Sequence, residues 1–99
     1  MRTIKNYIDS IEDELESAKD YAEKALEEKA RGNTAISNRY KEMAQDELKH
    51  GSFLHEMATK SADELSKVFT PPEEMLEKWR KAHADYVEKA AWVKHMLSL

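Results

Sequence analysis

In the stretch ISNRYKEMAQDELKHGSFLHEM, residues 36–57, side chains of one face recur in alternating steps of four and three. This spacing predicts a long helix with one buried face. The members of the stripe are Ile36, Tyr40, Met43, Glu47, His50, Leu54 and Met57. Glu47 and His50 stand where a helix built only for packing would carry Leu or Ile. Because burying a lone carboxylate costs several kcal/mol, this Glu-x-x-His predicts a charged partner or a metal ion nearby.

A second helix is predicted before this stretch, over residues 3–30, from apolar positions on heptad spacing. Its seam consists of Ile4, Tyr7, Ile11, Ala18, Tyr21 and Ala25, with Ile8, Leu15 and Ala22 beside them. Gly32 can close this helix in the left-handed conformation, and Asn33 or Thr34 can cap the next one, predicted over 34–68. So short a connection predicts an antiparallel hairpin.

A third helix is predicted over residues 71–98. Its expected start is Thr70-Pro71-Pro72-Glu73, where Thr70 would cap, proline would suit the first turn, and Glu73 would complete a capping box. The seam of this helix contains Leu76, Trp79, His83, Tyr86, Ala90, Val93 and Leu97. Residues 1–99 are therefore expected to form one all-α domain, a two-helix antiparallel hairpin plus a third helix.

Composition supports long helices and excludes several kinds of site. Of 99 residues, 36% are charged and 40% hydrophobic, and only two are glycine and two proline, too few for a sheet-rich fold. The absence of cysteine excludes disulfides, iron–sulfur clusters and thiolate chemistry, so oxygen and imidazole nitrogen must hold any metal.

The net charge of −4 comes with no basic block, so nucleic acid is not an expected partner. Met1-Arg2-Thr3-Ile4-Lys5 lacks the apolar run of a signal peptide, and no stretch is long enough to span a bilayer, which favours a cytoplasmic protein.

Glu14 is a second polar residue on an apolar seam, in line with Ile11 and Ala18. It lies 18 residues before Gly32, while Glu47 and His50 lie 15 and 18 residues after it. In an antiparallel hairpin these three side chains can meet at one level. Carboxylates with imidazole and no sulfur favour iron or manganese. One Glu from one helix with Glu-x-x-His from its neighbour is half of the di-iron carboxylate site found in four-helix bundles.

The segments Glu14-Leu-Glu-Ser-Ala-Lys-Asp-Tyr21 and Asp46-Glu47-Leu-Lys-His50 resemble the helix pair of ferritin-like proteins, namely the rubrerythrins and, closer in size, the encapsulated ferritins. The resemblance covers roughly residues 8–58. It implies that Glu14 is a metal ligand, Glu47 a bridging carboxylate and His50 a terminal imidazole ligand, with Tyr21 next to the metal. The cysteine-rich iron module of rubrerythrins is missing, which argues against a rubrerythrin function.

The same resemblance implies an assembly, because a complete ferritin-like bundle has four helices and two ligand sets. This chain has one set, so a second copy would complete the site across a two-fold axis, in a homodimer or larger homo-oligomer. The implied function is a ferroxidase-like oxidation of Fe(II), with two iron ions per dimer and manganese as an alternative metal, for iron storage or detoxification. The likeness to encapsulated ferritins adds an encapsulating shell protein as a potential partner, and the inside of a protein nanocompartment as a potential location.

Several residues keep alternative interpretations. Glu47 and His50 could be a hydrogen-bonded pair in a metal-free helical scaffold or protein-interaction module, where polar seam residues fix the register. Gly51 marks close approach of another helix, leaves room for a metal and an oxygen species, or is merely tolerated. His83 is expected to be a packed, hydrogen-bonded core residue rather than a ligand. The residues expected at the surface or at subunit contacts are Phe53, His55, Trp92 and His95.

Overall fold

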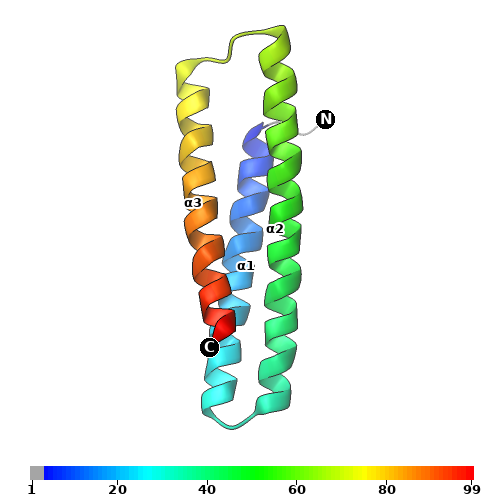
Figure 1. The fold of residues 1–99 in the computed structure, drawn as a ribbon, viewed down its shortest axis with the longest axis vertical. Coiled ribbons are helices and arrows are strands. Elements are labelled where there is room, and N and C mark those ends of the chain that lie inside the picture. Colours follow the sequence, from blue (N-terminus) through cyan, green and yellow to red (C-terminus); the bar gives the residue numbers. More distant parts are fainter. Residues whose placement is uncertain (1–3) are drawn as a thin grey trace.

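A computed structural model describes residues 4–99, which form three long helices joined by two short connections (Figure 1). The helices are α1 (Ile4–Ala30), α2 (Thr34–Val68) and α3 (Glu73–Ser98). The predicted all-α class and the order of three helices are confirmed. The predicted first helical residue, Thr3, lies outside the described residues. Along residues 4–99, no helix is both long and apolar enough to cross a membrane.

The predicted antiparallel hairpin of α1 and α2 is confirmed (Figure 1). Gly32 ends α1 with a φ of +82°, the left-handed conformation expected of it. Its N–H donates to the carbonyl of Lys29 at 3.0 Å, and the N–H of Asn33 donates to the carbonyl of Glu28 at 2.9 Å. This pair of bonds is a Schellman motif. Asn33 is the N-cap residue of α2, but its side-chain amide donates to the Glu28 carboxylate at 2.7 Å instead of capping the helix.

The predicted capping box at Thr70 is wrong. The third helix begins at Glu73, two residues later than predicted, and Pro72 is its N-cap residue in an extended conformation. The Pro72 carbonyl accepts hydrogen bonds from the N–H groups of Met75 and Leu76, at 3.0 and 3.2 Å. A residue followed by proline is pushed out of the helical region, so Pro71 cannot begin the helix and Thr70 is left outside it.

The buried face of α2 lies one residue along from the predicted stripe, which corrects that prediction. Four small residues at heptad spacing are buried instead, namely Ser37, Ala44, Gly51 and Ala58. Ile36 is 50% exposed and Met43 is 40% exposed. The opposing seam of α1 also contains small buried residues, Ala18, Ala22 and Ala25. Small side chains on both helices let the backbones approach closely, and the larger side chains of α2 therefore lie at the edges of the contact.

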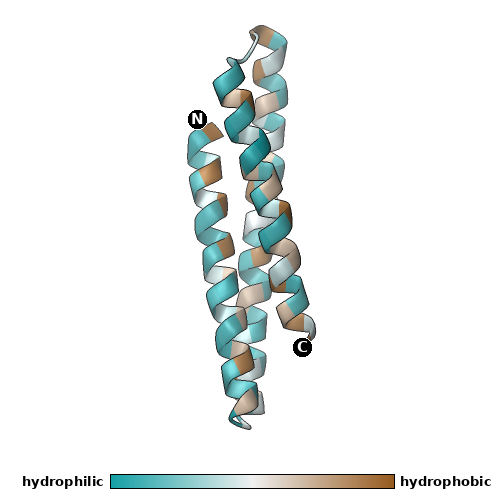
Figure 2. Cartoon of the chain, turned by 90° about the vertical axis from the view of Figure 1, so that its left-hand side faces the viewer, coloured by the Kyte–Doolittle hydropathy of each residue, from teal (hydrophilic) through white to brown (hydrophobic). Residues whose placement is uncertain are grey.

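The third helix packs mainly on α1 and makes few contacts with α2. Its carboxyl-terminal half is the better buried, through Ala90, Val93 and Met96. Ala90 and Val93 were predicted, whereas Met96 takes the buried position expected for Leu97. Lys29 of α1 also donates a hydrogen bond to the backbone oxygen of Leu99. Hydrophilic residues cover most of the outer surface of all three helices (Figure 2).

Candidate metal centre

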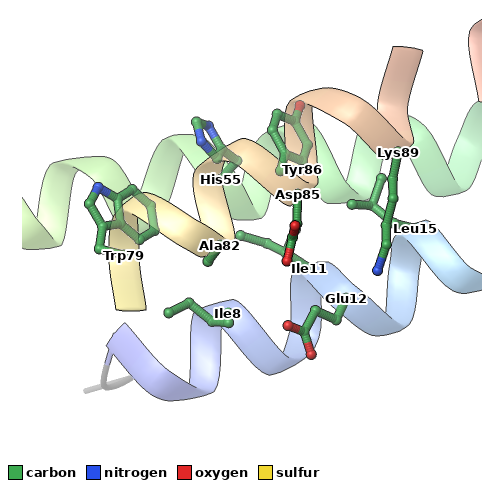
Figure 3. Close-up of a pocket in the computed structure, with 10 residues that line it drawn as sticks. All are labelled: Ile8, Ile11, Glu12, Leu15, His55, Trp79, Ala82, Asp85, Tyr86 and Lys89. Carbon is green, nitrogen blue, oxygen red and sulfur yellow. The ribbon is translucent and has the colours of Figure 1, made fainter. Parts of the chain in front are cut away.

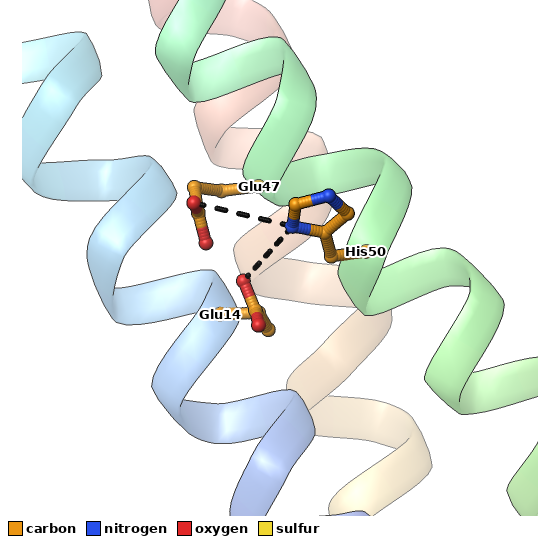
Figure 4. Close-up of side chains that lie close together, drawn as sticks. All are labelled: Glu14, Glu47 and His50. Atoms are coloured by element: carbon orange, nitrogen blue, oxygen red, sulfur yellow. Dashed lines mark ion pairs between the residues drawn. The ribbon is translucent and has the colours of Figure 1, made fainter.

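Three of the predicted site residues converge between α1 and α2. Glu14, Glu47 and His50 each offer one ligand atom, and these atoms lie within 4.8 Å of one another (Figure 4). His50 Nδ1 lies 3.6 Å from Glu14 Oε2 and 4.0 Å from Glu47 Oε1. The hairpin register set by Gly32 therefore places these residues as predicted, with one carboxylate from α1 and the Glu-x-x-His pair from α2.

Close approach of the two helices makes this convergence possible. A Cβ atom at Gly51 would lie 3.8 Å from the Glu14 Cβ and 3.8 Å from a Leu15 methyl group. Gly51 thus lies at a helix–helix contact, one of the interpretations that the sequence left open. Because Gly51 follows His50 directly, the contact holds the backbone of α2 beside the base of the Glu14 side chain.

The two carboxylates of the site are better shielded from water than the imidazole. The side chains of Glu14 and Glu47 are 28% and 24% exposed, whereas that of His50 is 61% exposed. Glu14 Oε2 is itself buried and has no hydrogen-bond partner. Its ion-pair partner, His50 Nδ1, lies 3.6 Å away, beyond hydrogen-bond distance. A buried oxygen without a hydrogen bond costs about 1–3 kcal/mol.

The neighbouring carboxylate of Glu14 makes Glu47 a weaker acid than an ordinary glutamate. The pKa of Glu47 is raised from 4.5 to about 7, first because a protonated Glu47 can donate a hydrogen bond to Glu14. Partial burial and the negative charges of Glu14 and Asp46 raise this pKa further, while the charge of His50 opposes the rise. The mutual repulsion of the two half-buried carboxylates therefore outweighs the attraction of His50, and further positive charge at this place would be stabilising.

A divalent cation fits this donor set. It would satisfy the orphan oxygen of Glu14 and neutralise the two carboxylates, and the oxygen and imidazole donors suit iron, manganese or zinc. Donor atoms around a single ion, with bonds of about 2.1 Å, would lie about 3.0–3.4 Å apart. The three donors are spaced more widely than this, by a difference that side-chain rotation can close. The exposed His50 leaves one side of the set open to further ligands.

Tyr21, which the ferritin-like resemblance places next to the metal, is not part of this cluster. It lies seven residues from Glu14, about 10 Å along the helix. Its ring stacks on Tyr40 of α2 with a centroid distance of 6.2 Å, and Lys24 Nζ lies 5.7 Å from the Tyr21 ring centroid. The described geometry therefore gives Tyr21 an aromatic partner across the hairpin.

A second polar cluster, between α2 and α3, was missed by the sequence analysis. His55 was expected at the surface, but it is half-buried and stacks on Tyr86, with ring centroids 4.3 Å apart, and on Trp79, at 5.7 Å. It lies beside a cavity of about 10 Å³ (Figure 3). His83 was expected in the core but is exposed, and its Nδ1 lies 2.8 Å from His55 Nε2. The one-residue shift of the buried face of α2 explains the error, because it turns His55 towards α3.

The two aromatic residues predicted at subunit contacts are both exposed in the single chain. Phe53 is 61% exposed and Trp92 is 54% exposed. His95 is exposed as well, and its ring lies beside that of Trp92 with a centroid distance of 5.8 Å.

No protein-family model, curated protein or solved structure matches the chain. The function is therefore inferred from the chemistry of the site.

Proposed function

We propose that this protein is a ferritin-like iron-oxidising protein, which binds Fe(II) through Glu14, Glu47 and His50 and oxidises it with oxygen or peroxide. The observation that carries the proposal is the convergence of two carboxylates and one imidazole within 4.8 Å, with a buried oxygen of Glu14 left without a hydrogen bond. A register device in a scaffold would need one polar residue, whereas three donors from two helices meet here.

Each residue has a defined role in this proposal. Glu14 and Glu47 would neutralise the charge of the iron substrate, and Glu47 would be the bridging carboxylate that the ferritin-like resemblance implies. His50 supplies a terminal nitrogen ligand from the open side. Each Fe(II) gives up one electron, and the oxidant, oxygen or peroxide, takes up two electrons with two protons. Storage of the Fe(III) product, or its detoxification, would follow from the same chemistry. Manganese suits the same donors.

The proposal includes a second copy of the chain. Three donors are too few to hold two ions, and the exposed side of His50 leaves room for the ligands of a partner. Two exposed apolar residues, Ile36 and Met43, precede Glu47 and His50 along α2. A homodimer would thus bring two half-sites together, complete a four-helix arrangement from two hairpins, and hold two iron ions. A larger homo-oligomer or a shell protein around it would extend this assembly.

Anaerobic titration with Fe(II), followed by measurement of bound iron per chain, tests the proposal. The wild-type protein should bind about one iron per chain, equal to two per dimer, and Glu47→Ala should bind none specifically. Asp46→Ala is the matched control, since it removes an exposed neighbouring carboxylate and should keep the stoichiometry of the wild type.

Admission of air to the loaded protein then tests oxidation. We expect Fe(III) absorbance to rise much faster with the wild type than with Glu47→Ala at equal iron. Equal, non-saturating uptake by the wild type and Glu47→Ala would overturn the proposal. The polar residues would then belong to a metal-free helical scaffold or interaction module.

A further inference from the structure

The contact between α2 and α3 depends on an unusual pair of histidines. These two helices touch little elsewhere, and the one side-chain hydrogen bond between them in residues 4–99 joins His55 Nε2 to His83 Nδ1, at 2.8 Å. Neither residue belongs to the candidate metal centre, and neither contacts it.

His55 Nε2 and His83 Nδ1 are close enough to share one proton in a hydrogen bond. The ring centroids are 5.0 Å apart and the nitrogens 2.8 Å apart, so the rings point their nitrogens at each other almost along one line. One nitrogen must carry the N–H and the other must accept it. The bond survives when the pair gains one charge, because an imidazolium can donate to a neutral imidazole. It cannot survive when both rings are charged, since two N–H groups and two positive charges would then face each other.

The surroundings disfavour the charged form of His55 in particular. Its ring is half-buried between those of Trp79 and Tyr86. Burial lowers the pKa of His55, and the charge of His83 lowers it further. The other titratable groups that line the cavity beside His55 are Glu12 of α1 and Asp85, Tyr86 and Lys89 of α3. Within residues 4–99, none of these four is hydrogen-bonded or ion-paired to either imidazole.

We infer that His55 and His83 form a proton-operated latch, which holds the middle of α3 against α2 while one proton is shared and releases it when both rings are protonated. The rest of α3 allows such a movement. Its carboxyl-terminal half is fixed by the buried residues Ala90, Val93 and Met96, whereas its amino-terminal half packs through partly buried residues such as Trp79. Release would uncover Leu54 and Met57 of α2, which pack in the same cluster as Trp79 and Tyr86. The protein would thus expose the apolar surface of Leu54 and Met57 fully only in acid.

Distance measurements between spin labels test this latch directly. The chain has no native cysteine, so Ser52→Cys on α2 and Ala84→Cys on α3 provide two exposed labelling positions in the full chain. Dilution with unlabelled protein removes distances between copies. We expect one short distance at about pH 8 and an added longer component at about pH 5, on either side of the usual histidine pKa.

Variants of His83 separate the latch from general acid unfolding. His83→Gln keeps a hydrogen-bonding group without a charge, and should keep the short distance at both pH values. His83→Arg places a permanent cation opposite His55. Its guanidinium can donate to neutral His55, so the short distance should remain at about pH 8, and the longer component should appear at about pH 5, where His55 is protonated as well. His95→Gln, which changes an exposed histidine elsewhere on α3, should respond to pH as the labelled wild type does.

A second label pair reports on the hairpin. Labels at Glu23→Cys and Asn38→Cys, on α1 and α2, should keep their distance in acid. An unchanged α2–α3 distance in the labelled wild type, or the same acid response in His83→Gln, would overturn the inference. So would a parallel change of the α1–α2 distance, because the whole chain would then be unfolding.

Discussion

Glu47 holds its proton unusually tightly, and this has a consequence for the stability of the metal-free protein. Its pKa of about 7 in the folded state lies above the ordinary value of 4.5. Between these values the folded state binds more protons than the unfolded state, so the free energy of unfolding falls as pH rises from about 4.5 to about 7. The destabilisation is complete above the folded pKa.

Glu47→Gln should remove this dependence. With a chelator present, we expect the variant to exceed the wild type in free energy of unfolding by on the order of 1 kcal/mol at about pH 8, and by little at about pH 4.5. Urea denaturation at both pH values measures the difference. The lowered pKa of His55 has the opposite effect, because it destabilises the fold as pH falls below 6.5, the ordinary pKa of histidine. Wild type and Glu47→Gln must therefore be compared at the same pH. Equal free energies of unfolding for the wild type and Glu47→Gln at about pH 8 would show that the Glu14–Glu47 pair does not destabilise the fold.

The two glycines of the chain should respond differently to alanine. A Cβ at Gly51 would meet its neighbours at 3.8 Å, an ordinary van der Waals contact, so Gly51→Ala should stabilise the helix by up to about 1 kcal/mol. Gly32 has a φ of +82°, so Gly32→Ala should destabilise the protein by about 1 kcal/mol. Thermal and urea unfolding of both variants would check the signs. Destabilisation by Gly51→Ala would mean that α1 and α2 approach more closely than described.

Among the helices, the α1–α2 contact depends on small side chains at one register. Ala44 is fully buried, whereas its neighbour Met43 is 40% exposed. Ala44→Leu should therefore push the helices apart and cost about 1–3 kcal/mol, while Met43→Leu should change stability by less than about 0.5 kcal/mol. Denaturation midpoints of the two variants provide the comparison. If Met43→Leu instead cost more stability than Ala44→Leu, Met43 would lie in the helix contact, as the sequence predicted.

This register explains what the sequence could and could not predict. The helices and the turn followed from heptad spacing and from Gly32, and the level at which Glu14 meets Glu47 and His50 followed from counting residues on either side of that turn. The buried face of α2 did not follow, because hydrophobicity ranks Ile36 and Met43 above Ser37, Ala44 and Gly51. Close helix packing instead selects the smallest residues. The same rotation turned His55 towards α3, where its partner His83 is distant in sequence and therefore invisible to local patterns.

In the whole molecule, large apolar side chains remain exposed along an elongated bundle with extents of 55 × 21 × 16 Å. On α2, the helix that also carries Glu47 and His50, these are Ile36, Met43, Phe53 and, as its last residue, Val68. If the proposed metal site is shared, these exposed apolar residues would favour association with a second copy, in which each chain supplies half of the ligands. Iron binding and dimer formation should then be thermodynamically linked, because a metal that binds only the dimer stabilises it.

Sedimentation velocity under anaerobic conditions tests this linkage. We expect Fe(II), but not Mg(II) at the same concentration, to shift the wild-type protein towards the dimer, because imidazole is a poor ligand for magnesium. His50→Ala should lose the shift, since it removes the donor that faces the partner while keeping the apolar residues. Phe53→Glu should weaken association with and without iron if Phe53 lies in the interface. If the wild-type protein binds iron but stays monomeric, the three donors of one chain bind the metal without a partner. If all variants form the same amount of dimer with and without iron, dimer formation does not depend on the metal centre.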